Sequence, residues 1–237
     1  MSLPDIEYID CKQTSIGLIC LRERTLPSEP ATVITEITLD HEFLMSSYNT
    51  ASERALASIA LEMHAGRGLR VLVGGLGLGY TAREALRSDR VGAVRVIEFV
   101  PQVIRWMQRG MIPLSAELNG DARLEVLHGD VYGTLEAPPD AVRHDLILID
   151  VDHSPDERLG EENGAFYTEA GLARAKDHLA PGGVLAVWSY AEHSPFADAM
   201  RAAFAEVRVE PVAFENVVLE ETETNWLFFG RDPVPTP

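Results

Sequence analysis

Acidic residues follow three apolar segments of the chain at equivalent points. Glu98 ends the run VRVIEF, Asp130 follows LEVL in the turn HGD, and Asp150 ends HDLILID. Any one of these acids alone could be a loop cap or a turn former. If the three segments are parallel strands, however, their carboxylates lie along one edge of the sheet, where such sheets bind ligands. A carboxylate there can accept hydrogen bonds from both ribose hydroxyls of a nucleoside, a role that suits Glu98.

A glycine-rich turn precedes these acids, between the predicted strand LRVLVGG and the predicted helix YTAREALRS. Gly75, Gly77 and Gly79 let the backbone turn sharply and approach a ligand closely, and a helix that begins there presents unpaired N–H groups. Their G-x-G-x-G spacing is not the G-x-G-x-x-G of dinucleotide sites, because the sixth position is Tyr80, and the Gly-Lys-Ser/Thr of a P-loop is missing. A tight turn without a ligand is the alternative interpretation, but the acids that follow favour a binding site.

The hydrophobic pattern that must position these residues changes near residue 66. Before it, short alternating segments predict a small antiparallel sheet, followed by a helix at 50–64. After it, continuous apolar runs separated by helical segments predict strands covered on both faces, and the last two runs form an antiparallel hairpin at the sheet edge. The predicted fold is α/β, with a doubly wound, Rossmann-like, seven-stranded sheet.

This organisation divides the chain into four parts. We expect an N-terminal β-strand domain at 1–48, a connecting helix at 49–66 and a Rossmann-like nucleoside-binding catalytic domain at 67–231. The Pro-rich remainder at 232–237 is a frayed tail.

Composition excludes several classes of function. Among 237 residues, 20 Lys plus Arg stand against 37 Asp plus Glu, a net charge of −17, and no basic run offers a footprint for nucleic acid or anionic lipid. No apolar run approaches the roughly 20 residues that cross a bilayer, so we expect a cytoplasmic protein without a membrane partner. Cys11 and Cys20 are too few for a metal cluster. They could face each other across a hairpin, but reduced thiols fit a cytosolic protein better.

Five segments together resemble the core of the spermidine synthase (polyamine aminopropyltransferase) family. They are VLVGGLGLGYTAREAL, VRVIEF, HGD, DLILID and FYTEAGLARAKDHLAPGGVLAV. The resemblance covers roughly 39–190 and is most specific over 70–190. It implies a class I S-adenosylmethionine-dependent methyltransferase-like fold with a small N-terminal β-domain, and a homodimer.

The resemblance also implies a donor and roles for the acids. The donor is decarboxylated S-adenosylmethionine, with its ribose on Glu98 and its adenine amine on Asp130, and Asp150 is the acid at the reacting centre. Since a protonated amine is a poor nucleophile, a carboxylate must orient it and take its proton as it attacks the carbon beside the sulfonium. The sulfonium is already an activated leaving group, so neither a metal nor a covalent nucleophile is needed.

Two departures fall at positions that give the family its reaction. The family's glycine turn carries an Asp that contacts the terminal amine of the donor, and that position is Leu78 here. A hydrophobic side chain cannot neutralise an ammonium group. The family's second Asp after the fourth strand is replaced by His153, with Asp152 one residue short of that spacing. Asp150, Asp152 and His153 are therefore the catalytic candidates, and an exposed loop histidine is the alternative for His153.

The amine-binding half of the site is harder to trace. The family's Tyr-His-Glu segment has no clean counterpart, and Tyr48 and Glu53 are its nearest equivalents, although Glu53 on a helix is by default a solvated charge. Tyr167 is a further candidate for substrate binding. The acidic segment at 151–166 is either a lid over the site or a solvated connecting loop.

Three functions remain open. The first is a spermidine synthase-like transferase that moves an aminopropyl group to a small cationic amine such as putrescine. The second is an S-adenosylmethionine-dependent methyltransferase on the same scaffold, for which Leu78 is a positive argument. The third is a diverged, non-catalytic nucleoside-binding module.

Overall fold

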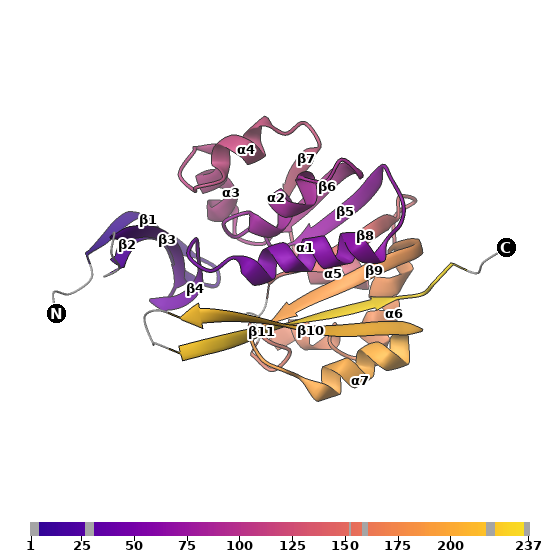
Figure 1. Cartoon of the computed structure of the whole chain (residues 1–237). Coiled ribbons are helices and arrows are strands. Elements are labelled where there is room, and N and C mark those ends of the chain that lie inside the picture. Colours follow the sequence, from indigo (N-terminus) through magenta and orange to yellow (C-terminus); the bar gives the residue numbers. More distant parts are fainter. Residues whose placement is uncertain (1–4, 27–30, 152, 158–160, 217–220, 235–237) are drawn as a thin grey trace.

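In a computed structural model, the described residues are 5–26, 31–151, 153–157, 161–216 and 221–234. The first of two sheets is antiparallel and four-stranded, in the order β1-β2-β3-β4. It lies at one end of the molecule, on the left in Figure 1. Its strands are β1 (Ile6–Thr14), β2 (Gly17–Leu26), β3 (Thr32–Leu39) and β4 (Glu42–Ser46).

The second sheet has seven strands in the order β10-β11-β9-β8-β5-β6-β7. Five neighbouring strands are parallel, and β10 and β11 form an antiparallel hairpin at one edge. The predicted doubly wound fold with a separate N-terminal β-domain is confirmed. The strands are β5 (Leu69–Gly74), β6 (Val91–Glu98), β7 (Leu124–His128), β8 (His144–Ile149), β9 (Leu179–Ser189), β10 (Glu206–Asn216) and β11 (Glu221–Arg231).

Helices cover both faces of this sheet, because side chains alternate between the faces along each apolar strand. In β5, Val71 and Val73 join a core with helices α1, α2 and α3, whereas Leu72 joins the core on the other face with α5, α6 and α7. Figure 1 shows the two layers on either side of the strands. The helices are α1 (Ala51–Met63), α2 (Tyr80–Leu86), α3 (Pro101–Gln108), α4 (Ser115–Gly120), α5 (Val131–Glu136), α6 (Glu169–Asp177) and α7 (Ser194–Ala203), with a 3-10 turn at Glu161–Ala165.

The expectation of reduced cysteines is wrong. The register of β1 on β2 places Cys11 directly opposite Cys20, and a disulfide joins them. Alternation alone had left both arrangements open, and the pairing of the two strands decided between them. Disulfides are rare in cytosolic proteins, so this bond and the expected cytoplasmic location point in opposite directions.

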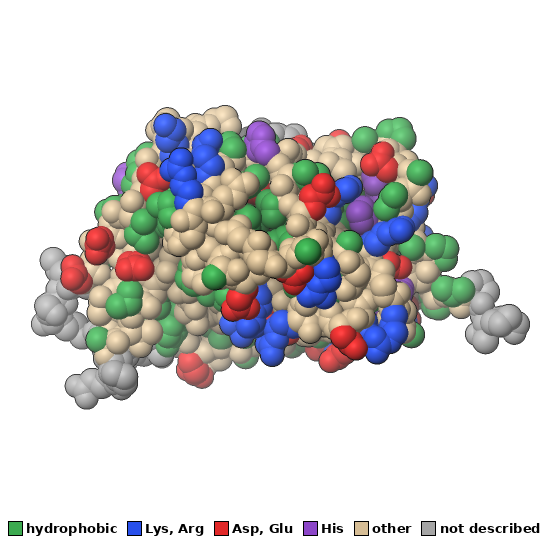
Figure 2. Space-filling model, turned by 90° about the horizontal axis from the view of Figure 1, so that it is seen from above, with side chains coloured by type: hydrophobic (Ala, Val, Ile, Leu, Met, Phe, Trp, Pro, Cys, Tyr) green, Lys and Arg blue, Asp and Glu red, His purple; other side chains and the backbone are tan. Residues whose placement is uncertain are grey.

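Opposite charges share the outer surface. On the face seen in Figure 2, acidic and basic side chains are interspersed. Exposed pairs such as Arg67 with Asp89 contribute little to stability, because water screens both charges. Among the described residues, no helix combines the length and the apolar character needed to span a bilayer.

Asp10 of β1 ties the N-terminal sheet to the larger domain. Its carboxylate accepts hydrogen bonds from Gln102 and from the indole N–H of Trp106, both on α3. Trp106 is fully buried, so its N–H has no water to replace this partner. Apolar side chains of the N-terminal sheet also belong to the hydrophobic core that contains Trp106, namely those of Ile19, Leu21 and Ile37.

We expect Asp10→Ala to lower the free energy of unfolding by about 1 to 3 kcal/mol, because it leaves a buried indole N–H without an acceptor. Urea denaturation followed by tryptophan fluorescence measures this. Asp89→Asn, which removes only an exposed ion pair, is the control and should change stability by less than about 0.5 kcal/mol. Equal effects of the two substitutions would show that Asp10 does not join the two parts.

Candidate active site

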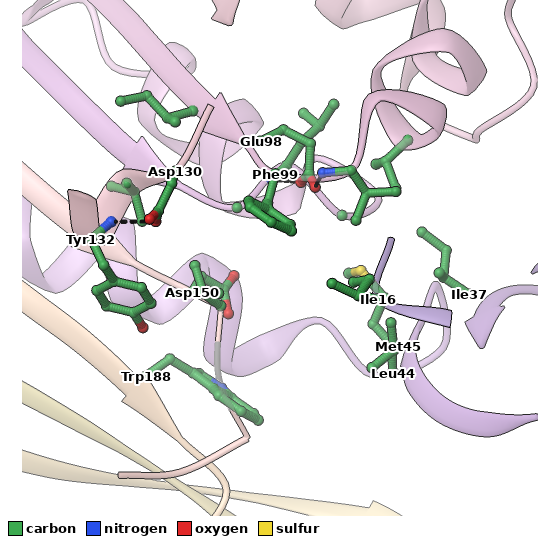
Figure 3. A pocket seen from close by; sticks show the side chains of 18 of the residues that line it. Ile16, Ile37, Leu44, Met45, Glu98, Phe99, Asp130, Tyr132, Asp150 and Trp188 are labelled. Atoms are coloured by element: carbon green, nitrogen blue, oxygen red, sulfur yellow. Dashed lines mark hydrogen bonds between the residues drawn. The ribbon is translucent and has the colours of Figure 1, made fainter. Parts of the chain in front are cut away.

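A cavity of about 210 Å³ lies where the carboxyl ends of β5, β6 and β8 meet the N-terminal sheet. Its polar lining includes four acids, Glu53, Glu98, Asp130 and Asp150. The predicted convergence of the three strand-end acids therefore occurs, and Figure 3 shows Glu98, Asp130 and Asp150 around one hollow. Among the described residues, no Lys or Arg lines the cavity.

The glycine turn forms the floor of this cavity through backbone conformations that suit glycine. Gly75, Gly77 and Gly79 have φ of 88°, 50° and 89°. A Cβ on Gly75 would lie 2.3 Å from the carbonyl oxygen of Asp150, and one on Gly77 would lie 2.3 Å from Sδ of Met45. Gly75 and Gly77 line the cavity, whereas Gly79 is the N-cap of helix α2 and is not part of the lining. The turn is thus pressed between β8 and the N-terminal sheet.

Glu98 holds this turn in place. Its carboxylate accepts backbone N–H groups from Leu76 and Val100, each at 2.7 Å. Burial raises the pKa of Glu98, and these two donors lower it in part. Each carboxylate oxygen can accept more than one hydrogen bond, so Glu98 can hold the turn and still meet a ribose hydroxyl.

Asp130 is both a helix cap and a cavity residue. Its Oδ1 accepts the N–H of Tyr132 at 2.9 Å, the usual bond of an N-cap, at the start of α5. The side chain is exposed and lines the cavity beside Tyr132. Tyr167 does not line the cavity. Its hydroxyl shares a hydrogen bond of 2.9 Å with the hydroxyl of Tyr132, so Tyr167 helps to orient a residue that does line it.

Asp150 and Glu53 both line the cavity, and Asp150 is half-buried whereas Glu53 is buried. Asp150 accepts a hydrogen bond of 2.7 Å from the Thr81 hydroxyl, and Glu53 accepts one of 2.9 Å from Ser52, which in turn accepts one from Asn225. Burial raises the pKa of Asp150 to about 6, against the hydrogen bond from Thr81. Burial, and then the charge of Asp150, raise the pKa of Glu53 to about 7. The interpretation of Glu53 as a solvent-exposed charge on a helix is therefore wrong.

Other candidates fall into three groups. His153 lines the cavity, with its ring 6.5 Å from that of Tyr190. Tyr48 is 41% exposed and lies outside the cavity. Asp152 lies outside the described residues, as does part of the segment at 151–166. Leu78 is fully buried in the hydrophobic core, so the family's position for an amine-binding Asp does not face this cavity.

The sequence did not indicate the apolar wall of the cavity. Ile16, Ile37, Leu44 and Met45 of the N-terminal sheet gather on the side opposite Asp130, and Trp188 of β9 closes the space below Asp150 in Figure 3. Alternation along these strands showed which residues share a face, but not that this face meets the glycine turn. Within the described part of the chain, no group of three His, Cys, Asp or Glu side chains could hold a metal.

Two alanine substitutions distinguish the free-energy cost of a steric clash at the glycine turn from the cost of backbone strain alone. Gly68 also has a positive φ, 69°, but a Cβ there meets nothing within 4 Å. We expect Gly68→Ala to cost about 1 kcal/mol from backbone strain alone. Gly75→Ala should cost about 1 to 3 kcal/mol more, because its Cβ strikes the backbone of Asp150. Thermal unfolding measures both, and equal losses would contradict the close approach.

Glu53→Gln should stabilise the protein at pH 8. The pKa of Glu53 is higher in the folded protein than in the unfolded chain, so the folded form holds more protons between about pH 4.5 and 7 and stability falls as the pH rises through that window. Gln removes the buried charge and can still accept from Ser52. The expected gain is about 1 to 3 kcal/mol at pH 8 and smaller at pH 5, by urea denaturation.

Glu62→Gln is the matched control, since Glu62 is exposed on the same helix. It should change stability at neither pH. A loss of stability from Glu53→Gln at pH 8 would show that the charged form is favoured in the folded protein, contrary to the raised pKa.

Comparison with known proteins agrees with the resemblance found in the sequence. No family model matches the chain. Over 121 residues, 50% of this chain, it is 38% identical to polyamine aminopropyltransferase 2 of Streptomyces coelicolor, although the match spans only 21% of that relative.

Solved structures match nearly the whole chain. A spermidine synthase in complex with the transition-state analogue AdoDATO aligns with a TM-score of 0.75 and 21% identity, over 96% of this chain and 74% of that one. Spermidine synthase from Thermotoga maritima gives 0.72 and 20%, over 96% and 73%. The fold of the chain is thus similar to that of the spermidine synthases, and half of its length is similar in sequence to a polyamine aminopropyltransferase.

Proposed function

We propose that the chain is a spermidine synthase-like transferase, which binds an S-adenosylmethionine-type donor and transfers an aminopropyl group to an amine. The observation that carries this proposal is the charge of the cavity. Four carboxylates line it, and no Lys or Arg does so among the described residues. A sulfonium and protonated amines are cations, and buried carboxylates bind cations far better than neutral or anionic groups.

The same charge distribution favours the decarboxylated donor. Ordinary S-adenosylmethionine carries a carboxylate, which would enter a cavity lined by Glu53, Glu98 and Asp150, and no Lys or Arg of the described residues lines this cavity to pair with it. Like charges in a desolvated site repel strongly. The name of the matched aminopropyltransferase and the AdoDATO complex of the structural relative agree with this choice.

The residues divide the work as follows. Glu98 and the backbone of the glycine turn bind the ribose, and Asp130 meets the adenine amine. Asp150 orients the attacking amine and takes its proton, directly or through water, and its pKa of about 6 leaves it ionised at neutral pH. A new N–C bond forms while the C–S bond breaks, and its electron pair returns sulfur to a neutral thioether.

Leu78 is the specific observation in favour of a methyltransferase. It leaves the glycine turn without the acid that the family uses for the terminal amine of the donor. Glu53 offers a buried carboxylate in the same cavity from α1, and we assign it the role of binding an ammonium group. The homodimer, the cytoplasmic location, the absence of a nucleic-acid partner and the domain boundaries stay predictions.

Calorimetry with the two donors tests the proposal. We expect decarboxylated S-adenosylmethionine to bind at least about tenfold more tightly than S-adenosylmethionine, because the acids that line the cavity repel a carboxylate and no described Lys or Arg lines it. Equal or reversed affinities would favour the methyltransferase. No binding of either donor would favour a module without this activity.

Asp150→Asn tests the catalytic role. Asn can still accept from Thr81 but cannot take a proton, so kcat should fall by about 100-fold or more while donor affinity changes little. Asp145→Asn, at the opposite end of the same strand, is the control and should keep turnover. Turnover unchanged in Asp150→Asn would remove this residue from the mechanism.

A further inference from the structure

A buried amide side chain joins the edge hairpin of the large sheet to helix α1. Asn225 lies within β11, and its side chain is 9% exposed. Strand β11 packs against α1, and Nδ2 of Asn225 donates a hydrogen bond of 2.9 Å to Oγ of Ser52, near the start of that helix. Asparagine is disfavoured in strands, and burying an amide without a partner is costly. The hydrogen bond to Ser52 offsets that cost.

Ser52 connects this amide to Glu53. A serine hydroxyl has one proton to donate and lone pairs with which to accept. Since the amide N–H of Asn225 can only donate, the oxygen of Ser52 accepts there, and its single proton is donated to Glu53, whose Oε2 lies 2.9 Å away. Ser52 is 1% exposed, so water does not compete for these bonds. The two hydrogen bonds therefore direct a proton donor at the carboxylate.

The direction of these bonds favours the ionised form of Glu53. A carboxylate can only accept, so it matches the proton that Ser52 presents, whereas a protonated carboxyl group has a proton of its own and needs a different arrangement. Burial, and then the charge of Asp150, raise the pKa of Glu53, and the hydrogen bond from Ser52 is one of the contacts that lower it. Without this bond, Glu53 would stay protonated to a higher pH.

Other charged and titratable side chains also act on Glu53. Asp150, at the end of β8, raises the pKa of Glu53, whereas Arg54, the next residue of α1, lowers it. The guanidinium of Arg54 lies over the ring of Tyr80 on α2, whose own pKa is raised by burial and further by Glu53. The cavity that Glu53 lines also includes Glu98, Asp130 and His153. Substitution of either hydrogen-bonding residue leaves all these groups in place, so comparison with the wild type isolates the two bonds.

We propose that Asn225 and Ser52 are positioning residues of the active site. They hold the carboxylate of Glu53 ionised in the cavity, where it binds the ammonium group of the donor. This inference rests on the proposed function, which assigns that ammonium group to Glu53. Neither Asn225 nor Ser52 lines the cavity, so both act through Glu53. The edge hairpin of the sheet is thereby part of the machinery that binds the donor.

Two ligands distinguish positioning of Glu53 from general damage to the fold. Decarboxylated S-adenosylmethionine carries the ammonium group, whereas methylthioadenosine has the same nucleoside without it. In calorimetric titrations at about pH 7, we expect Ser52→Ala to bind decarboxylated S-adenosylmethionine about tenfold more weakly than the wild type, because a hydrogen bond to a charged group is lost. Asn225→Leu acts one bond further away and should weaken binding about threefold. Methylthioadenosine should bind both variants as tightly as the wild type.

The pH profile of donor binding tests the cause of this loss. The affinity of the wild type for decarboxylated S-adenosylmethionine should rise with pH as Glu53, with a pKa of about 7, becomes ionised. In both variants this rise should move to higher pH, by about one unit in Ser52→Ala and less in Asn225→Leu. Asp150, with a pKa of about 6, contributes equally to all the profiles. Thr222→Ala, at an exposed position of β11, is the control and should leave the profile unchanged.

A double substitution shows whether Asn225 acts through Glu53. Glu53→Gln keeps an acceptor for the Ser52 hydroxyl but has no charge to hold. In this background, Asn225→Leu should cause no further loss of affinity for decarboxylated S-adenosylmethionine. A further loss as large as in the wild-type background would overturn the inference. So would unchanged pH profiles in both single variants, or an equal loss of affinity for methylthioadenosine, which would indicate a structural role only.

Unfolding in urea distinguishes failure of this inference from failure of the proposed function. Absence of binding of both nucleosides by the wild type would overturn the proposed function. The effect on Glu53 is then read from stability alone. A folded-state pKa raised further by the substitution makes stability fall more as the pH rises, so Ser52→Ala and Asn225→Leu should lower the urea midpoint more at pH 8 than at pH 5. Equal losses at the two pH values would overturn the inference as well.

Discussion

The close approach of the glycine turn to the ends of its neighbouring strands is the constraint on which the site depends. Gly75 donates its N–H to the carbonyl of Ile97, and Asp150 donates its N–H to the carbonyl of Gly74. A side chain on Gly75 would strike the carbonyl of Asp150. Because β5, β6 and β8 are held this tightly, their terminal acids converge on one hollow, and Thr81 at the start of α2 comes within reach of Asp150. Removing this approach would separate the acids without changing any of them.

The convergence of the acids on one cavity also has an electrostatic consequence. Loss of hydration raises the pKa of both Glu53 and Asp150, and the charge of Asp150 raises that of Glu53 further, so keeping both carboxylates ionised opposes folding. Such pairs are concentrated at functional sites, where a cationic ligand relieves the repulsion. The network of Asn225, Ser52 and Glu53 spans β11 and α1, so it fixes one acid from elements far from the glycine turn. The arrangement favours binding of cations over stability of the ligand-free protein.

The N-terminal sheet supplies the apolar wall of this cavity. Its apolar residues continue the core of the larger domain and then line the cavity, and Met45 rests on the glycine turn, where its sulfur lies 3.1 Å from the N–H of Leu78. Asp10 anchors the first strand to α3. The apolar wall of the cavity is therefore tied to the domain that carries the acids.

Local patterns determined the sheet, its helices and the three strand-end acids, because continuous apolar runs, glycine spacing and an acid at each strand end are properties of neighbouring residues. The helices α4, α5 and α7 were not named from the sequence, and the six residues each of α4 and α5 carry too little periodicity to read. Only the tertiary structure decided that Glu53 is buried beside Asp150, that Leu78 points into the core, that Cys11 meets Cys20, and that Ile16 and Leu44 face the acids. These are contacts between segments distant in the chain or across paired strands. Sequence periodicity tells which face of an element a residue occupies, but packing alone determines what that face meets.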